Sequence, residues 1–263
     1  MIPFRRSQPG DPGWSADEHH RDSLKRWRKR ALGPARWTLI PIGVGLWLLS
    51  LDSLGTWDYW LGFSFATVAC LYSMLRESPP EYISRWQDGA EGERSTAKIL
   101  EPLRSEGYLI RHDLQTLKGN WDHVIVAPTA VYVLDSKNLG GKLVVNPNGV
   151  WVQRGDADDN YDYRAGNLTN GAEQAGRHLH SLIRERTGVS VWVQSVVVVW
   201  GDFPQGTIVS GKSVFVRGDL LVGWLRSRST KLPADKFRAG VATLTHMRPA
   251  GSIRRRRPDW AGV

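Results

Sequence analysis

Cysteine is almost absent from this sequence, in which Cys70 is the single example among 263 residues. An intrachain disulfide is therefore excluded, and so is a zinc site built from cysteine ligands. A lone thiol also fits a reducing compartment. No internal repeat is visible, and the length allows one sizeable domain with appendages.

An excess of positive charge is missing from the centre of the chain, although the net charge is +9. Residues 1–36 hold nine basic and four acidic residues, and residues 248–263 hold five basic and one acidic residue. This leaves 21 basic and 21 acidic residues for 37–247. Two basic ends around a neutral body favour membrane orientation over the steering of DNA into a basic cleft.

Two long apolar stretches follow a polar N-terminal region. Residues 1–36 have few apolar residues and no periodicity, and we interpret them as a disordered basic region. Trp37–Leu51 carries no charge, and Trp57–Leu75 carries only Asp58. Each stretch approaches the ~20 residues that a helix needs to cross a bilayer. Residues 37–76 therefore predict a transmembrane helical hairpin, with both chain ends in the cytoplasm by the positive-inside rule.

Two other interpretations of the apolar stretches are a pair of buried helices and a cleaved signal peptide. A pair of buried helices in a soluble domain stays open, because the first stretch is short and contains Pro41. A cleaved signal peptide fits less well, since the leading polar region is too long and no small-residue cleavage site follows the first stretch.

A second domain is expected after a linker at 77–84 that contains Pro79 and Pro80. It spans 85–247 and alternates helical with strand-like patterns, which indicates an α/β fold with one mixed central sheet flanked by helices. Helices are predicted at 88–105, 172–187, 220–226 and 234–247, and strands at 108–112, 121–126, 131–137, 142–145, 150–153, 191–200 and 213–216. A basic tail, 248–263, closes the chain.

A β-hairpin between residues 121 and 138 brings acidic residues together. A loop centred on the bond between Pro128 and Thr129 pairs residues whose numbers sum to 257, and Pro128 favours a four-residue loop over a two-residue turn. Asp122 then lies opposite Asp135, with Cβ atoms ~5 Å apart on one face. Lys137 shares that face, because strand side chains alternate.

Two opposed carboxylates repel, and a divalent cation removes the conflict. Mg²⁺ accepts carboxylate oxygens and bridges to phosphate, while a lysine beside it can orient the attacking water and offset negative charge. The alternative is a solvated strand end with a Lys–Asp ion pair.

The same residues resemble the nuclease-related domain, or NERD, family. The resemblance covers roughly residues 85–200 and rests on four motifs in order. They are Gly89-Ala90-Glu91-Gly92-Glu93 at a helix start, Asp122-His123, Asp135-Ser136-Lys137-Asn138 and Gln174-Ala175. The resemblance implies the mixed-sheet fold of the PD-(D/E)xK nucleases, which is restriction-endonuclease-like.

Site residues follow from the resemblance. Asp122 resembles the first metal-binding acid, and Asp135 and Lys137 resemble the acid and lysine of the (D/E)xK element. The Ser136 carbonyl would be a further ligand for Mg²⁺ or Mn²⁺, and Glu93 resembles the helix acid that completes the metal shell.

Gln174 matches a later glutamine of the family and would position phosphate or the lysine. The chain departs from the family at Thr129-Ala130, where glycine is frequent. His123 alternates away from Asp122 and is expected to be packed or hydrogen-bonded on the other face. His178 lies one helical turn after Gln174, where a surface histidine is expected.

Two charged segments accompany the domain. The acidic loop between Asp156 and Asp162 lacks the spacing of an EF-hand and is interpreted as solvated. Arg254–Arg257 would hold anionic lipid or nucleic acid, or form a tail without a partner.

The sequence thus predicts a membrane-anchored protein that hydrolyses phosphodiester bonds in DNA or RNA with Mg²⁺ or Mn²⁺. One alternative is a catalytically silent nuclease-fold module that binds nucleic acid or a protein partner at the membrane. A third is an adaptor in which the hairpin and the basic ends carry the function.

Overall fold

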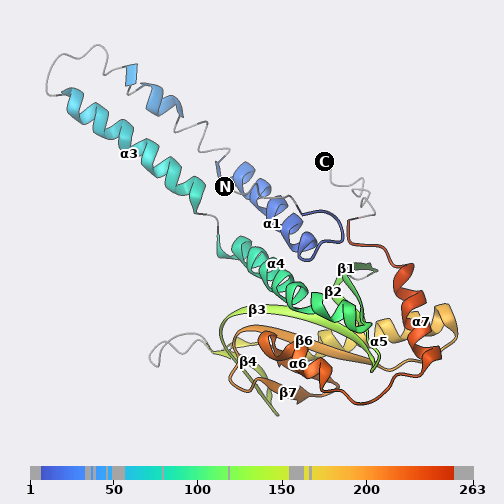
Figure 1. Cartoon of the computed structure of the whole chain (residues 1–263). Coiled ribbons are helices and arrows are strands. Elements are labelled where there is room, and N and C mark those ends of the chain that lie inside the picture. The colour runs from blue at the N-terminus through green and yellow to red at the C-terminus, as the bar shows by residue number, and fades with distance from the viewer. Residues whose placement is uncertain are drawn as a thin grey trace. The chain divides into compact units, whose positions relative to one another are not determined.

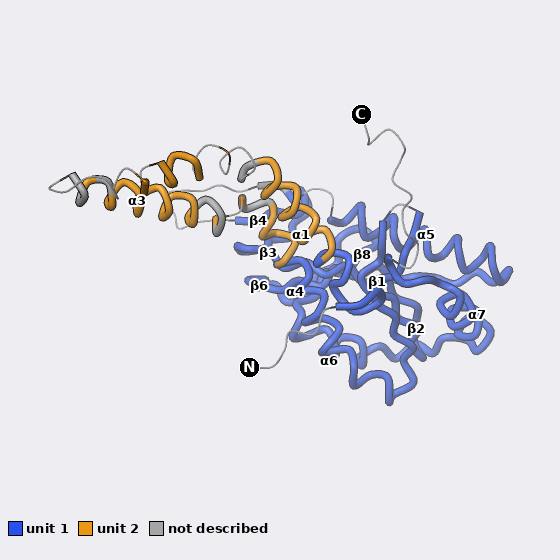
Figure 2. The backbone as a smooth tube through the Cα atoms, turned by 90° about the horizontal axis from the view of Figure 1, so that it is seen from above, with its two compact units in different colours: residues 1–17, 88–263 blue, residues 18–87 orange. Residues whose placement is uncertain are grey.

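The computed structural model describes residues 7–32, 37, 40–45, 47–48, 57–78, 80–117, 119–153, 163–165 and 168–251. The chain divides into two compact units (Figure 2). One comprises residues 1–17 and 88–263, and the other comprises residues 18–87. The predictions for the connection at 52–56, the acidic loop at 156–162 and the arginine run at 254–257 lie outside the described residues.

The N-terminal region contains a helix where no regular structure was expected. Helix α1 (Trp14–Trp27) is followed by a π-helical turn, η1 (Arg28–Leu32). Glu18 and Arg21 form an ion pair of 2.9 Å one turn apart, and Lys25 and Arg26 occupy the last turn, where the helix dipole favours cations. The prediction of a disordered region is therefore wrong for residues 14–32. The His19 ring stacks on Trp86 with centroids 4.8 Å apart, and His20 Nδ1 lies 2.9 Å from the Ile83 carbonyl, so tertiary contacts support a helix that has no apolar stripe.

The predicted transmembrane hairpin is not supported. In the described part of the chain, no helix combines the length and the apolar character that a membrane crossing requires. Helix α3 (Trp57–Glu77) forms where the second apolar stretch was predicted, but it includes Asp58, Arg76 and Glu77 beside several hydroxyl side chains. The first stretch is described only at residues 37, 40–45 and 47–48.

One mixed sheet organises the unit of residues 1–17 and 88–263. Its main path runs β1-β2-β3-β6-β8-β7, while β4 pairs with β3 and β5 with β4. The strands are β1 (Leu109–Thr116), β2 (Gly119–Val126), β3 (Val131–Asn146), β4 (Gly149–Gln153), β5 (Tyr163–Arg164), β6 (Val193–Asp202), β7 (Thr207–Ser210) and β8 (Ser213–Arg217). β3 is parallel to β6 and β6 to β8, and the other pairs are antiparallel. The predicted mixed α/β fold is confirmed.

Helices cover both faces of this sheet (Figure 1). They are α4 (Glu81–Leu100) with the 3-10 turn η2 (Glu101–Glu106), α5 (Leu168–Thr187), the 3-10 turn η3 (Gly218–Leu220) leading into α6 (Leu221–Arg226), and α7 (Ala234–Thr245). Tyr132 and Leu134 of β3 pack into a buried cluster with α4, η2 and α6. Val131 and Val133 point the other way, into a cluster with α5 and α7. This strand alternation explains the β-branched and aromatic run of the sequence.

Several boundaries differ from the predicted ones. β3 runs continuously through the two strands predicted at 131–137 and 142–145, with an irregularity in its pairing with β6 between Asn138 and Lys142. α4 begins at Glu81, directly after Pro80, so the predicted linker at 77–84 is partly helical. Proline is tolerated just before a helix because it has no N–H to leave unpaired.

Candidate active site

The hairpin of β2 and β3 has the predicted register. His123 pairs with Leu134 and Val126 with Val131, so the residue numbers sum to 257. The Ala127 N–H donates to the Ala130 carbonyl over 2.9 Å and closes the four-residue loop. Asp122 and Asp135 flank the last ladder pair, at the open end of the hairpin.

One polar contact connects β2 to β3 at this end, and a second lies within β3. The backbone N–H of Ser136 donates to Asp122 Oδ2 over 2.7 Å. Lys137 Nζ donates to Asp135 Oδ1 over 2.5 Å, and their side chains are 32% and 30% exposed, so solvent and a ligand can reach them. A cavity of about 210 Å³ lies beside Asp122 and Asp135 and is bordered by Ala172 of α5.

Glu93 projects from α4 and is only 7% exposed. Its Oε2 accepts the backbone N–H of Gly13 over 3.1 Å. Burial and the nearby Asp113 carboxylate raise the pKa of Glu93 to about 7, and the negative charge of Asp135 adds to this, although the Gly13 N–H and Lys137 act against it. Near neutral pH this carboxyl group is divided between its charged and neutral forms.

Asp122 and Lys137 have shifted pKa values for opposite reasons. Burial raises the pKa of Asp122 well above its usual range, and the charges of Glu93 and Asp135 raise it further. Burial lowers the pKa of Lys137, but the attraction of Asp135 and Asp122 outweighs burial and raises that pKa above its ordinary value. Lys137 is thus a permanent cation among three acids, and two of these acids, Asp122 and Glu93, hold their protons more readily than ordinary carboxyl groups.

The position of α4 depends on Thr96, one turn after Glu93. Thr96 Oγ1 donates to the Gly92 carbonyl and accepts bonds from Ser136 Oγ at 2.9 Å and Trp200 Nε1 at 2.8 Å. Thr96 is fully buried, so this hydroxyl ties the helix to β3 and β6. The contact places Glu93 on the same edge of the sheet as the aspartates.

Gly92 explains part of the glycine-containing motif. A Cβ at this position would lie 3.1 Å from the Asn138 Cβ, which leaves little room for a larger residue. Asn138 Nδ2 also donates to the Asp88 carbonyl over 3.2 Å. The motif therefore allows α4 to approach the end of the (D/E)xK-like element.

Gln174 does not border the cavity of the two aspartates. It is exposed and lines an adjoining groove of about 650 Å³ between α5 and the turn joining β1 to β2. The groove and the cavity share Asn120, Trp121, Gly171 and Ala175. His178 also lines the groove, and its ring packs edge-on against Trp121 with centroids 5.2 Å apart.

His123 is fully buried on the face away from the aspartates, as predicted. Its Nδ1 shares a hydrogen bond of 2.7 Å with Nδ1 of His112, across the β1–β2 pair. It belongs to the packing of the domain and not to the acidic site.

The donor chemistry of the site fits a hard divalent cation, since the site consists of carboxyl groups. Burial raises the pKa values of Glu93 and Asp122 most, and the charges of neighbouring carboxylates raise them further. Among the described residues, however, no group of three or more His, Cys, Asp or Glu side chains already has the geometry of a metal site. A cation held by these acids would therefore require their side chains to turn toward one another.

Part of the chain is similar to a known family. Residues 88–200 match the family model of the nuclease-related domain, NERD. The matched segment starts within α4 and ends in β6, so it contains Glu93, the hairpin and Gln174. No curated protein and no solved structure matches the chain.

The matched segment also contains residues in structural contacts that the sequence analysis did not predict. Asp113 is fully buried with a positive φ of 46°, and it accepts hydrogen bonds from the Ser15 N–H at 3.0 Å and Asn120 Nδ2 at 2.6 Å. Asn120 Nδ2 also donates to Ser15 Oγ over 2.9 Å. The only sign of this contact in the sequence is the unusual position of Asp113 inside a strand. Nothing in the sequence marks Ser15 as its partner.

Proposed function

We propose that the nuclease-related domain hydrolyses phosphodiester bonds in DNA or RNA with Mg²⁺ or Mn²⁺. The observation that carries the proposal is the hairpin register, which brings Asp122 beside Asp135 and Lys137 at one strand end. A carboxylate pair with an adjacent ammonium suits a reaction in which negative charge develops on phosphate.

Asp122, Asp135, Glu93 and the Ser136 carbonyl would hold the metal. The bound metal would supply Lewis acidity and a template for the phosphate. The Ser136 N–H orients the Asp122 carboxylate by a hydrogen bond. The hydrogen bond between Ser136 Oγ and Thr96 Oγ1 holds α4, and with it Glu93, against β3.

Lys137 acts as a cation and not as a base, because its raised pKa keeps it protonated throughout the neutral range. Its ammonium can donate hydrogen bonds to a phosphate oxygen or orient the attacking water. Gln174 lines the groove beside the acids, where its amide can bind the substrate backbone.

The decisive experiment is hydrolysis by the full chain. Labelled single-stranded DNA, double-stranded DNA and RNA are each incubated with Mg²⁺, Mn²⁺ or EDTA. Asp122→Ala and Lys137→Ala should each lower the rate at least ~100-fold. Lys142→Ala and Asp202→Ala, which change exposed residues of β3 and β6, are matched controls and should stay within about twofold. Activity that survives Asp122→Ala and Lys137→Ala would exclude this site.

A catalytically silent module that binds nucleic acid or a protein partner is the second candidate. Two observations favour it: the described acids do not form a ready metal site, and Gly13 already occupies one oxygen of Glu93. Binding of Mn²⁺ or nucleic acid without turnover on any of the three substrates would support this candidate over the enzyme.

We further propose that residues 37–76 attach the protein to the cytoplasmic face of a membrane, with both chain ends cytoplasmic. Helix α3 exposes large apolar side chains, with Trp60, Phe63 and Met74 exposed by 68%, 67% and 60%. Apolar surface of this kind is typical of a site that contacts lipid or another protein. Fractionation of cells that express the full chain tests this. Recovery in the supernatant without detergent would contradict it.

A further inference from the structure

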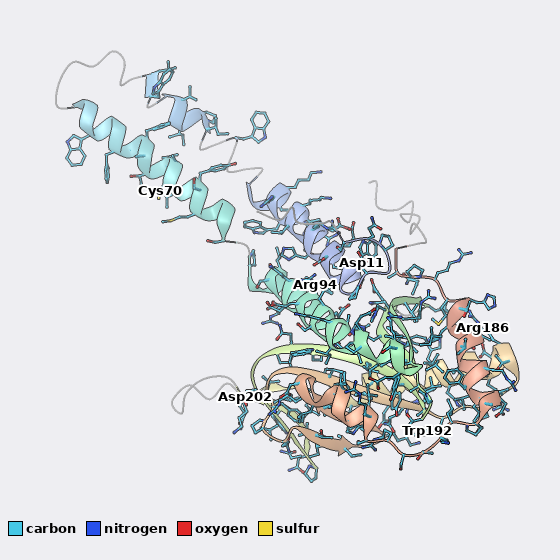
Figure 3. The ribbon with its side chains drawn as sticks, in the orientation of Figure 1. Asp11, Cys70, Arg94, Arg186, Trp192 and Asp202 are labelled. Atoms are coloured by element: carbon cyan, nitrogen blue, oxygen red, sulfur yellow. The ribbon has the colours of Figure 1, made fainter. Side chains whose placement is uncertain are left out.

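A second cavity, of about 330 Å³, lies at another end of the sheet. It is bounded by the β2–β3 loop, the residues that enter β6 and the segment between α6 and α7. Figure 3 shows Trp192, which lines it, and Asp202 at opposite ends of β6. Tyr132, at its floor, and Asp135 are three residues apart on β3 and so face opposite sides of the sheet. The cavity is therefore separate from the acidic site.

Aromatic rings form much of its wall. Tyr132 is 1% exposed, and its ring packs edge-on against Trp224 with centroids 5.9 Å apart. Trp192 is 60% exposed and offers a large ring surface at the rim. Exposed tryptophan beside buried aromatic packing is a surface on which a planar ligand can stack.

Three cations share the cavity with these rings. Arg228, Lys231 and Lys236 line it, and none of the described lining residues is acidic. The Arg228 guanidinium carbon lies 4.6 Å from the centre of the Trp224 ring, which holds the charge at the wall. The acidic site has the opposite sign, so the two cavities select different chemical groups.

The wall is fixed by backbone contacts. The Leu232 N–H donates to the Pro128 carbonyl over 2.8 Å, which ties the segment between α6 and α7 to the β2–β3 loop. At the floor, the hydroxyl groups of Thr129 and Tyr132 share a hydrogen bond of 3.2 Å. The aromatic and cationic groups are thus arranged before a ligand arrives, which lowers the entropic cost of binding.

We propose that this cavity binds a nucleotide, either free or as the end of a nucleic acid strand. A purely apolar ligand would leave the charges of Lys231 and Lys236 unused, and a simple anion would leave the rings unused. A base joined to a phosphate satisfies both, by stacking on Trp192 and by pairing with Lys231 and Lys236. The cavity reaches the lower range of volumes that small-ligand sites occupy, ~300 Å³ and above.

The test is calorimetric titration of the full chain in EDTA, which prevents metal-dependent hydrolysis. The probes are AMP, adenosine, inorganic phosphate and a short single-stranded DNA with or without a 5′-phosphate. AMP should bind more tightly than adenosine and than phosphate. Trp192→Ala and the double variant Lys231→Ala with Lys236→Ala should each weaken AMP binding about tenfold, in line with the loss of one stacking contact or of charge contacts.

Arg238→Ala is the matched control, because Arg238 is an exposed cation of α7 outside the cavity lining, and it should leave the affinity unchanged. Tighter binding of AMP than of the 5′-phosphorylated DNA identifies a free nucleotide, and the reverse identifies a strand end. Either result supports the proposal. It is overturned if neither probe binds, if phosphate binds as tightly as AMP, or if the cavity variants behave like the control.

Discussion

Gly13 donates its backbone N–H to Glu93 Oε2 over 3.1 Å, across 80 positions of sequence. The contact places the N-terminal segment against the one acid of the site that comes from a helix. It leaves the second oxygen of Glu93 outside this hydrogen bond. Gly13 has a φ of +75°, and a Cβ there would lie 2.7 Å from the Ala90 carbonyl oxygen, so the contact requires glycine.

Gly13→Ala should detach this segment from Glu93. Both the left-handed backbone and the clash with Ala90 oppose alanine, and the expected loss in the free energy of unfolding is about 1–3 kcal/mol. Urea denaturation measures it. Gly223→Ala is the control, because an added Cβ at this helical glycine meets nothing within 4 Å and should be neutral or stabilising. Equal effects of the two substitutions would contradict the role assigned to Gly13.

Glu93→Gln should stabilise the protein at pH 8 but not at pH 4.5. The pKa of Glu93 is raised to about 7 in the folded state, from about 4.5, so the folded state binds more protons between these values. The contribution of Glu93 to the free energy of unfolding therefore decreases as pH rises from 4.5 to 7, by at most about 3 kcal/mol. Glutamine stays neutral and does not show this decrease. Glutamine keeps an oxygen that can accept the Gly13 N–H.

The measurement for Glu93→Gln is the urea midpoint at pH 4.5, 6 and 8. Glu91→Gln is a matched control, since Glu91 is an exposed neighbour on the same helix and should shift the midpoint little at any pH. A pH-independent effect of Glu93→Gln would show that the carboxyl group titrates as it does in the unfolded chain.

The hairpin could be predicted from sequence because strand alternation and the proline in the loop fix the register locally. Asp122, Asp135 and Lys137 followed from that register by counting. Glu93 came only from the family resemblance, since nothing local distinguishes a metal-binding glutamate from a solvated one. The partners of Glu93 and Asp113 could not be predicted, because Gly13 and Ser15 lie 80 and 98 positions away and reach them only after folding.

One helix and several element boundaries could not be predicted from local patterns. α1 has no apolar stripe, and its contacts with Ile83 and Trp86 of α4 exist only in the folded chain. The strands predicted at 131–137 and 142–145 form one strand, and the interval between them remains only as the irregular pairing of β3 with β6 between Asn138 and Lys142. Such an irregularity depends on the neighbouring strand and leaves no local pattern in the sequence.

Asp122→Asn should remove activity while leaving the fold as stable or more stable. Burial and the charges of Glu93 and Asp135 penalise the Asp122 carboxylate, whereas the asparagine oxygen can still accept the Ser136 N–H. A gain of up to ~2 kcal/mol at pH 8 is expected, as for other strained functional sites. Asp202→Asn, at the exposed end of β6, is the control. Strong destabilisation by Asp122→Asn would mean that the carboxylate is structural.

The paired histidines of β1 and β2 should make the domain sensitive to acid. Arg104 Nη2 lies 3.2 Å from His112 Nε2, and arginine can only donate, so His112 carries its proton on Nδ1 and donates it to His123. His123 Nε2 then holds a proton and, among the described residues, has no partner. Burial and Arg104 lower the pKa of His112 to about 4, and burial also lowers the pKa of His123 well below its ordinary value.

Because these folded-state pKa values lie below the unfolded value of about 6.5, the unfolded chain binds protons first as pH falls. The contribution of the two histidines to the free energy of unfolding should therefore be constant above pH 6.5 and fall between pH 6.5 and 4, by at most about 3 kcal/mol from His112. The double variant His112→Leu with His123→Leu should flatten this fall, since both partners of the hydrogen bond become apolar together. His246→Leu, at an exposed position, is the control and should keep the acid sensitivity. Urea midpoints at pH 7, 6, 5 and 4.5 measure the effect, and an unchanged slope in the double variant would assign the acid sensitivity to other groups.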